Sequence, residues 1–431
     1  MDFVVEPSAV ASGNVSVPGD KSISHRALML SAVADGLTTV TGFLPSEDCL
    51  ATASALRAMG VSVDQVGDTV VRVKGVGACG LHAPDGPLDL GNSGTALRLL
   101  AGLLAGQSFS TELTGDASLR SRPMGRVIKP LEMLGAKIAS HDSKPPLMIT
   151  GGKVLDGIKY RLPVASAQVK SAILLAGLNA SDDVGIIEPE VTRDHTERML
   201  RTLGAVVDQG ENGIWMPGGQ SLTGTDIAVP ADFSSAAFLI LAATIAVDTE
   251  LTIPGVGVNP TRTGFISILN DMGANISVDN LRCLGEEPVA DLTVRSARLH
   301  GIDIDPTKVS LAIDEFPALF IAAACATGKT TFEGIAELRV KESDRIVAMA
   351  NGLRVLGVDV VESRDGAVVV GSKIQGGRVD SLGDHRIAMA FAVGATIADS
   401  AVTISNTANV YTSFPGFVAC LLSLGVSIDC N

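Results

Sequence analysis

Charged residues recur at the starts of predicted apolar helices, and their chemistry is considered first. The first turn of a helix has N–H groups without intrahelical partners and is partly positive, so it attracts phosphate or carboxylate groups. Lys21, Ser22 and Arg26 add donors and charge before an apolar segment that starts at Ala27. Comparable turns carry more cations and acids: Arg122, Lys170, Arg193, Lys341, Arg345 and Arg386, with Asp232, Asp314, Glu342 and Asp384. A helix start needs only one capping oxygen, so this excess indicates anion binding and acid–base chemistry.

Asp314 and Glu342 also have simpler structural explanations. Asp314 or Glu315 can cap the buried helix that follows, and Glu342 can belong to a solvated first turn with helix-spaced ion pairs. Gly91 and Gly94 suit a tight turn that another group approaches closely. Three histidines lie within the same motifs, and we expect them to be surface or capping residues rather than catalytic ones: His25, His195 and His385.

The elements that position these residues repeat six times. A helix that ends in a Met-Gly or Leu-Gly pair and leads into a strand recurs roughly every 70 to 80 residues, which is the signature of an internal repeat. Its glycines are expected to be left-handed C-caps, and they lie at Gly60, Gly135, Gly204, Gly273, Gly357 and Gly425.

A polar turn and a nearly apolar helix precede each of these helix–glycine segments. Each unit therefore contains a buried helix and a second, more polar helix between strands. Three units fill residues 20–230 and three fill 231–431, which predicts an α/β protein with two similar lobes. The chain is expected to cross between the two lobes near residues 19–20 and 230–231. Three buried helices in each lobe would direct their N-termini toward one face, and two opposed faces would form a positive cleft.

Composition excludes several classes of partner. The chain has 431 residues, of which 46% are hydrophobic, and a net charge of −14, which opposes nonspecific binding to nucleic acid or anionic lipid. Only 3% of residues are aromatic, so a base-stacking surface is not expected. The longest apolar run, 236–247, is shorter than the roughly 20 residues that cross a bilayer.

The six cysteines form no Cys-x-x-Cys pair and have no histidine at metal-ligand spacing. They are therefore expected to be reduced thiols, with no metal site. The first residues show no basic segment followed by an apolar run. We expect a cytoplasmic monomer that binds small molecules and needs no cofactor.

The motifs resemble those of the 5-enolpyruvylshikimate-3-phosphate (EPSP) synthase family along essentially the whole chain. The matching segments are 19–26, 90–95, 122–124, 166–168, 314–317, 339–345 and 383–386. The resemblance implies an inside-out α/β barrel fold in which each lobe has three βαβαββ repeats, joined by a two-strand hinge. It also implies that residues 1–19 belong to the C-terminal lobe, because in that family the first strand packs there.

The implied reaction moves the enolpyruvyl group of phosphoenolpyruvate to the 5-hydroxyl of shikimate 3-phosphate, with Asp314 as base and Glu342 as acid. By resemblance, shikimate 3-phosphate would contact Lys21, Ser22, Arg26, Ser166, Ala167, Gln168, Arg193, Asp314 and Lys341. Phosphoenolpyruvate would contact Lys21, Gly94, Arg122, Gln168, Arg345 and Arg386, and Lys21 is also assigned a catalytic role. Flanking Lys341 and Arg345 favour ionised Glu342, so we expect bound anions and lobe closure to promote its protonation.

Some residues depart from the common family pattern. Ala167 stands where many members have serine, and Thr412 stands where many bacterial members have a lysine that contacts phosphoenolpyruvate. With the segments 166–170, 193–197 and 259–262, these departures resemble the second class of the family, whose members are often less sensitive to glyphosate. Gly94 lacks the extra methyl group of some tolerant members, so sensitivity stays open.

Two alternatives remain at this point. The sister enzyme UDP-N-acetylglucosamine enolpyruvyl transferase shares the fold and the donor substrate, but it normally has a cysteine in the loop 116–122, where this chain has none. A nonenzymatic repeat protein that binds phosphometabolites would not need both Asp314 and Glu342.

Overall fold

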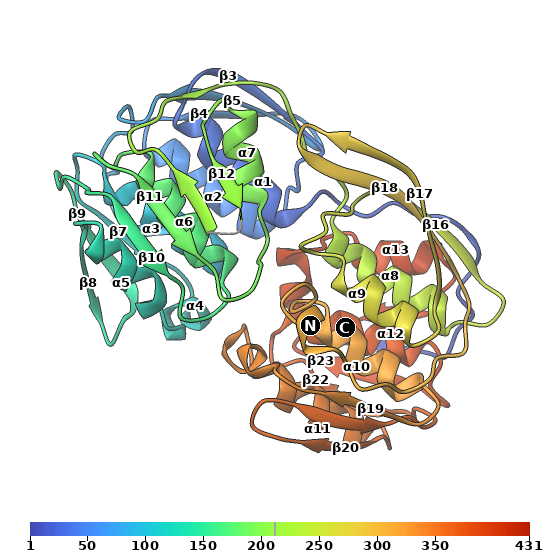
Figure 1. The fold of residues 1–431 in the computed structure, drawn as a ribbon. Helices are drawn as coiled ribbons and strands as arrows, with labels where there is room; N and C mark the ends of the chain where they lie inside the picture. The colour runs from blue at the N-terminus through green and yellow to red at the C-terminus, as the bar shows by residue number, and fades with distance from the viewer. Residues whose placement is uncertain (211–212) are drawn as a thin grey trace. The chain divides into compact units, whose positions relative to one another are not determined.

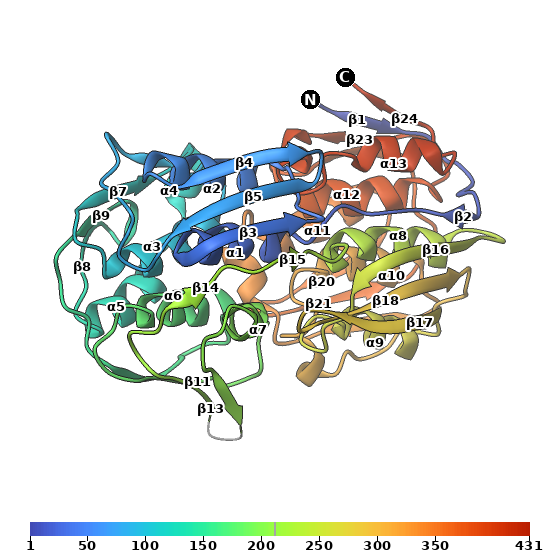
Figure 2. The same ribbon diagram turned by 90° about the horizontal axis from the view of Figure 1, so that it is seen from above.

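The computed structural model describes residues 1–210 and 213–431, and these residues form two compact units. The N-terminal unit contains 19–229 together with the short segment 284–287. The C-terminal unit contains 1–18, 230–283 and 288–431. Each unit has its own hydrophobic core. Figures 1 and 2 show the elements of each unit.

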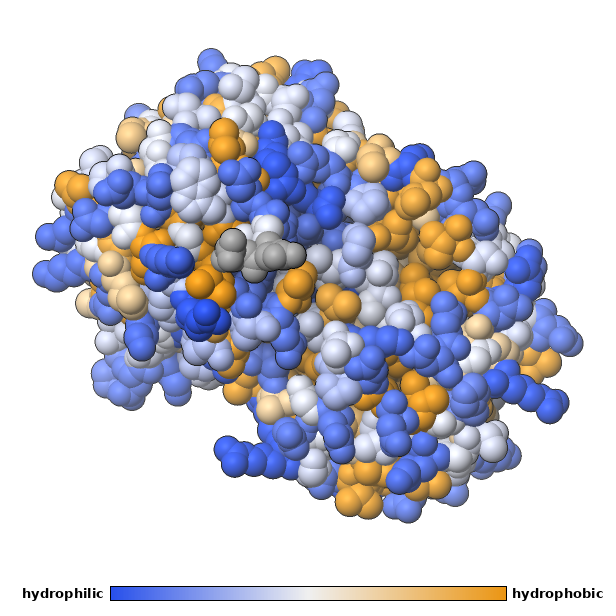
Figure 3. All heavy atoms as spheres, viewed as in Figure 1, coloured by the Kyte–Doolittle hydropathy of each residue, from blue (hydrophilic) through white to orange (hydrophobic). Residues whose placement is uncertain are grey.

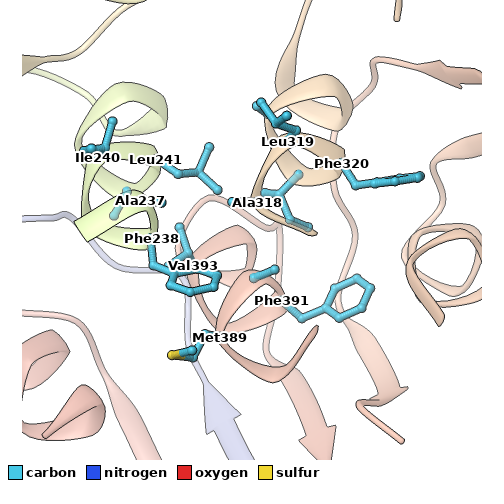
Figure 4. Packing of buried hydrophobic residues seen from close by; sticks show 14 of the residues in the cluster. Ala237, Phe238, Ile240, Leu241, Ala318, Leu319, Phe320, Met389, Phe391 and Val393 are labelled. Atoms are coloured by element: carbon cyan, nitrogen blue, oxygen red, sulfur yellow. The ribbon is translucent and has the colours of Figure 1, made fainter. Parts of the chain in front are cut away.

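Three buried helices form the centre of each unit, as the apolar sequence segments predict. In the N-terminal unit they are α1 (Lys21–Ala32), α3 (Gly94–Ala105) and α6 (Ala167–Gly177). In the C-terminal unit they are α8 (Phe233–Ile245), α10 (Phe316–Cys325) and α12 (His385–Ala395). Figure 4 shows Phe238 of α8, Leu319 of α10 and Phe391 of α12 within one apolar cluster. Helices that are apolar on every side are stable only when surrounded in this way.

The second helix of each repeat ends at a glycine in the left-handed conformation, as predicted. These helices are α2 (Glu47–Ala58), α5 (Gly125–Met133), α7 (His195–Thr202), α9 (Gly264–Asp271), α11 (Arg345–Val355) and α13 (Phe417–Ser423). After α2, Gly60 has φ +89° and its N–H donates to the Arg57 carbonyl, while Val61 N–H donates to the Leu56 carbonyl. The same pair of hydrogen bonds follows all six helices, so each is closed by a Schellman motif.

Three sheets cover the helices of the N-terminal unit. Their strand orders are β14-β3-β5-β4 with β15 also on β3, then β6-β7-β9-β8, and then β10-β11-β13-β12. The first contains β3 (Ala34–Thr41), β4 (Ser62–Gly67), β5 (Val70–Val76), β14 (Leu222–Thr223) and β15 (Ile227–Ala228). The others contain β6 (Leu88–Asp89), β7 (Thr111–Thr114), β8 (Lys137–His141), β9 (Lys144–Thr150), β10 (Ile158–Arg161), β11 (Val184–Ile187), β12 (Asp208–Gly210) and β13 (Gly213–Met216). The end of the third repeat therefore completes the sheet of the first.

Three further sheets belong to the C-terminal unit. Their orders are β17-β18-β16-β2, β19-β21-β20 and β22-β23-β1-β24. Their strands are β2 (Gly13–Asn14), β16 (Glu250–Gly257), β17 (Asn275–Leu284), β18 (Glu287–Arg295), β19 (Lys329–Phe332), β20 (Asp359–Glu362), β21 (Ala367–Val370), β22 (Gly377–Asp380), β23 (Val402–Ser405), β1 (Phe3–Val5) and β24 (Ile428–Cys430). Strand β1 is antiparallel to both β23 and β24, so the first strand completes the last repeat, as the family resemblance implies.

All six cysteines are free thiols, as the sequence predicts. Among the described residues, no helix has the length and apolar character needed to cross a membrane. On the face displayed in Figure 3, hydrophobic residues are interspersed with hydrophilic ones.

Candidate active site

Asp314 lies among three cationic side chains of the C-terminal unit. Its Oδ1 atom is 3.5 Å from both Lys341 Nζ and Arg345 Nη1, and its Oδ2 atom is 3.8 Å from Arg386 Nη2. Arg386 Nη1 also donates a hydrogen bond of 3.0 Å to the Asp314 carbonyl. The N-cap position of α10 belongs to Glu315, so the interpretation of Asp314 as a helix cap is wrong. The Asp314 carboxylate does not cap α10; it contacts the cationic cluster of Lys341, Arg345 and Arg386.

Glu342 shares this cluster through Arg345. Arg345 Nη2 is 2.5 Å from Glu342 Oε2, and Arg345 Nε is 2.8 Å from Asp384 Oδ2. Glu342 precedes α11, which Asp344 caps by accepting a hydrogen bond from Val347 N–H. The predicted helix-spaced ion pair is therefore present, although Glu342 lies outside the helix. About a quarter of its side chain is exposed (27%), so a ligand can reach the carboxyl group.

Arg345 is the buried centre of the cluster, with only 1% of its side chain exposed. Burial alone would lower the pKa of Arg345, but the carboxylates of Asp384, Glu342 and Asp314 raise it overall. The Arg345 guanidinium is therefore always charged, and it contacts both candidate catalytic carboxylates, Asp314 and Glu342.

In the N-terminal unit, Lys21 and Arg26 start helix α1. Lys21 Nζ is 2.5 Å from Asp48 Oδ2. Arg26 donates to Thr196 Oγ1 at 2.6 Å and to Ser171 Oγ at 2.8 Å, and Nη1 donates to the Ser22 carbonyl. Burial lowers the pKa of Arg26 to about 10, which leaves it charged at neutral pH. These acceptors are neutral oxygens, while the nearby carboxylates of Glu197 and Asp20 also act on the charge of Arg26.

A second cationic group, Arg122, follows the short helix α4 (Ala117–Ser121) and reaches the turn before α3. Arg122 is buried and donates to Asn92 Oδ1 at 2.5 Å and to Ser118 Oγ at 3.1 Å. Within the residues that the structure describes, no carboxylate pairs with it, and its Nε has no hydrogen-bond partner. A methyl group added at Gly94 would lie 3.2 Å from Arg122 Nη1. Gly94 therefore leaves room for an anion beside an uncompensated guanidinium.

Gln168 connects α6 to α3. Its Oε1 accepts from Arg98 Nη1 at 2.7 Å, and its Nε2 donates to Thr95 Oγ1 at 2.9 Å. Ser166 caps α6 through Val169 N–H, and Ala167 is the first helical residue. The hydrogen bonds of Gln168 and Arg26 thus bring together the N-terminal turns of α1, α3 and α6.

Lys170, one of the cations at the predicted helix starts, is fully buried and pairs with Glu197 at 2.8 Å and Glu188 at 3.0 Å, so it compensates carboxylates inside the N-terminal unit. Its Nζ also donates to the carbonyl of Thr192, the residue before the partly exposed Arg193.

The three histidines of the helix-start motifs are buried, so the expectation that they lie on the surface is wrong. His25 lies 2.8 Å from Thr52 Oγ1 and 3.4 Å from Ser93 Oγ, and burial lowers its pKa well below the usual value. His195 pairs with Glu287 at 2.7 Å. His385 follows the N-cap of α12 and is also buried. A histidine held among buried groups from distant segments shows no local sequence signal of its burial.

Thr412 occupies the position where the family pattern has a lysine. It is buried, and its hydroxyl donates to the Asn409 carbonyl at 2.7 Å, while Asn409 Nδ2 donates to the Gly383 carbonyl. This contact joins the 3-10 helix Ala408–Thr412 to the turn before α12.

No group of His, Cys, Asp or Glu among the described residues has the arrangement of a metal site.

Sequence reasoning assigned no site role to Arg98, Asn92 or Arg262, and it considered Glu315 only as a possible helix cap. Arg98 had a visible signal, since it is the one charged residue in the apolar helix α3. Arg262 is 3% exposed and contacts residues of α8 and α10, which lie far from it in the sequence.

Comparison with known proteins identifies the same family. A family model described as EPSP synthase (3-phosphoshikimate 1-carboxyvinyltransferase) matches residues 5–421. The 3-phosphoshikimate 1-carboxyvinyltransferase of Acidithiobacillus ferrooxidans is 55% identical over 427 residues, covering 99% of this chain and 98% of the relative. The enzyme of that name from Alkalilimnicola ehrlichii is 56% identical over 430 residues, covering 99% and 96%.

Solved structures agree with these matches. An EPSP synthase structure from Acinetobacter baumannii has a TM-score of 0.88 and 49% identity, with both chains fully covered. The enolpyruvyl transferase NikO from Streptomyces tendae has a TM-score of 0.79 at 18% identity, covering 99% of this chain and 98% of NikO, which is a likeness of fold. The inside-out α/β fold is thereby confirmed.

Proposed function

Because the chain belongs to the EPSP synthase (3-phosphoshikimate 1-carboxyvinyltransferase) family, we propose that it transfers the enolpyruvyl group of phosphoenolpyruvate to the 5-hydroxyl of shikimate 3-phosphate and releases phosphate. A C–O bond forms between this hydroxyl oxygen and C2 of phosphoenolpyruvate, and the bond from C2 to the phosphate oxygen breaks. The observation that carries the proposal is that Asp314 and Glu342 share the buried Arg345.

The charges of the site suit these substrates. Each carries a carboxylate and a phosphate of about −1.5 to −2 charge, which cations and helix N-termini attract. In this proposal shikimate 3-phosphate binds Lys21, Ser22, Arg26, Ser166, Ala167, Gln168, Arg193, Asp314 and Lys341. Phosphoenolpyruvate binds Lys21, Gly94, Arg122, Gln168, Arg345 and Arg386. Arg122 supports the assignment most directly, because it is a buried cation without a carboxylate partner among the described residues.

Asp314 and Glu342 divide the proton transfers in this proposal. Glu342 gives a proton to the methylene carbon, which makes C2 electrophilic, while Asp314 accepts the proton of the attacking hydroxyl. A tetrahedral intermediate results. Glu342 then takes a proton back from the new methyl group, and Asp314 returns its proton to the departing phosphate. Both residues end as they began, so no external acid, base or oxidant is required.

Glu342 must be protonated to begin this sequence, although its pairing with Arg345 favours the carboxylate. We propose that the substrate anions share the charge of Arg345 and thereby favour protonated Glu342 in the ternary complex. An isotope-edited carboxyl spectrum of Glu342, recorded across pH with and without the equilibrated substrates, tests this step. An unchanged titration on binding would contradict it.

A phosphate-release assay tests the function as a whole. With phosphoenolpyruvate present, we expect release with shikimate 3-phosphate and none with UDP-N-acetylglucosamine. The opposite preference would favour the sister transferase, and release with neither would favour a binding protein.

Substitution of the two carboxylates gives a sharper test. Asp314→Asn and Glu342→Gln are each expected to lower kcat about 100- to 10,000-fold, because general acid–base catalysis contributes that much. Both variants keep the size of the side chain, so retained thermal stability separates loss of chemistry from loss of fold. Near-normal turnover in either variant would remove that residue from the mechanism.

A further inference from the structure

Glu315 is a buried carboxylate that lies between two guanidinium groups. Its side chain is 1% exposed, and Oε1 lies 3.6 Å from Arg386 Nη1 and 3.8 Å from Arg262 Nη2. It occupies the N-cap position of α10, yet its side chain caps no helical N–H. The Glu315 carboxylate therefore contacts the two arginines rather than the backbone N–H groups of α10.

Ser234 sets the orientation of this carboxylate. Its hydroxyl donates to Glu315 Oε1 at 2.5 Å and accepts a hydrogen bond of 2.7 Å from Arg262 Nη2. Asp232, the N-cap of α8, places Ser234 by accepting a hydrogen bond from its N–H. Glu315 Oε1 is thus held from the α8 side while it faces Arg386.

Arg262 provides the opposing charge. It is 3% exposed, and its guanidinium contacts Ser234 Oγ at 2.7 Å, Glu315 Oε1 at 3.8 Å and Asp232 Oδ1 at 3.7 Å. The turn that presents it is closed by Asn259, whose Oδ1 accepts from Thr261 N–H and whose carbonyl accepts from Arg262 N–H. This buried arginine is a structural counter-ion.

The arrangement matters because Arg386 has to bind an anion. A carboxylate 3.6 Å away orients a guanidinium but also competes with an incoming carboxylate for its charge. Arg262 shares the charge of Glu315 and so reduces this competition.

We propose that Glu315 is a positioning residue for Arg386 and that Arg262 is the counter-ion that keeps Glu315 from neutralising it. This inference rests on the proposed function, in which Arg386 binds phosphoenolpyruvate. It predicts that Arg262 controls affinity for phosphoenolpyruvate without touching it, and that the effect depends on the charge of Glu315.

A double-mutant cycle tests this dependence. Arg262→Met is expected to raise KM for phosphoenolpyruvate about tenfold, with KM for shikimate 3-phosphate changed less than about twofold. Adding Glu315→Gln should restore most of the loss, because the unshared negative charge is then gone. Glu315→Gln alone should raise KM for phosphoenolpyruvate about threefold through loss of orientation.

The control is Arg282→Met, which removes a partly exposed arginine of the same unit that pairs with Asp291. It should leave both KM values unchanged. An unchanged KM for phosphoenolpyruvate in folded Arg262→Met would overturn the proposal. So would equal increases for both substrates without restoration in the double variant, since that pattern indicates a general structural defect.

If Arg262→Met does not fold, Glu315→Gln alone decides, and an unchanged KM for phosphoenolpyruvate overturns the proposal. A readout without turnover is the rise in Tm that phosphoenolpyruvate causes, which should shrink in Arg262→Met and return in the double variant. Failure of the proposed function appears differently, as an absence of phosphate release by the unsubstituted protein. If the unsubstituted protein also shows no Tm rise with phosphoenolpyruvate, the inference falls with the function.

Discussion

Gly94 is a residue whose missing side chain matters for the proposed site. A Cβ atom there would lie 2.8 Å from Arg98 Nη1 and 3.2 Å from Arg122 Nη1. Both contacts are shorter than ordinary packing distances, so one guanidinium must move or the methyl group must enter the space proposed for phosphoenolpyruvate.

We predict that Gly94→Ala raises KM for phosphoenolpyruvate about tenfold while KM for shikimate 3-phosphate stays within about twofold. Steady-state kinetics measure both values, and the inhibition constant of glyphosate can be measured beside them. Gly86→Ala is the matched control, because a Cβ there meets nothing within 4 Å. Equal effects of the two substitutions would disprove a special role for the space at Gly94.

His25 adds a pH dependence to stability. Burial, followed by the charges of Lys21 and Arg26, lowers its pKa in the folded protein. Below about pH 6.5 the unfolded chain therefore binds a proton that the folded protein does not, and unfolding becomes easier as pH falls. Above that pH, His25 contributes no slope.

The predicted slope is at most about 1.4 kcal/mol per pH unit. Urea unfolding at pH 6.5 and pH 5.5 measures it, with His25→Gln as the variant that cannot take up the proton. We expect the unsubstituted protein to lose about 1 kcal/mol more than the variant over this interval. Equal losses in both proteins would show that His25 does not titrate between these states.

At the scale of elements, Lys170 joins helix α6 to helix α7 and to the segment before it. Its Nζ contacts Glu197 in α7, Glu188 and the Thr192 carbonyl. Burial raises the pKa of Glu197, although Lys170 opposes this shift. The lysine therefore compensates negative charge between packed elements.

We predict that Lys170→Met lowers the free energy of unfolding by about 3 to 5 kcal/mol, because it leaves buried carboxylates without their cation. Adding Glu197→Gln should recover part of the loss. Lys373→Met provides the control, since Lys373 is 75% exposed and its loss should change stability by at most about 1 kcal/mol. Urea unfolding compares the three variants, and a loss in Lys170→Met as small as that control would refute the assignment.

At the scale of the whole molecule, the chain closes each unit with segments distant in sequence. Strand β1 is hydrogen-bonded on both edges, to β23 and to β24, and Phe3 stacks with Phe417 at a ring-centroid distance of 6.4 Å. The C-terminal unit therefore depends on the first residues of the chain. The N-terminal unit has a separate hydrophobic core and contains Trp215, the only tryptophan.

Deletion of residues 2–6 is predicted to destabilise the C-terminal unit selectively. Far-UV circular dichroism should then show an early unfolding transition that Trp215 fluorescence does not report, because that fluorescence follows the N-terminal unit. Coincident transitions by both probes would contradict independent stability of the two cores.

Local patterns in the sequence determined the repeats, the buried helices and their glycine C-caps. They depend on hydrophobic periodicity and on hydrogen bonds between residues three to five apart, as between Val61 and Leu56. The helix-start motifs also carried the family resemblance and the proposed residues. Repeated local rules of this kind are visible in one sequence.

Only the tertiary structure decided which charges face one another. Lys170 and Arg26 both follow a polar turn, yet one pairs with buried carboxylates and the other with neutral hydroxyls. Arg262 and Glu315 meet across Ser234, from three separate segments. Their protonation and their availability to substrate depend on burial and on neighbours far away in sequence, which periodicity and spacing do not encode.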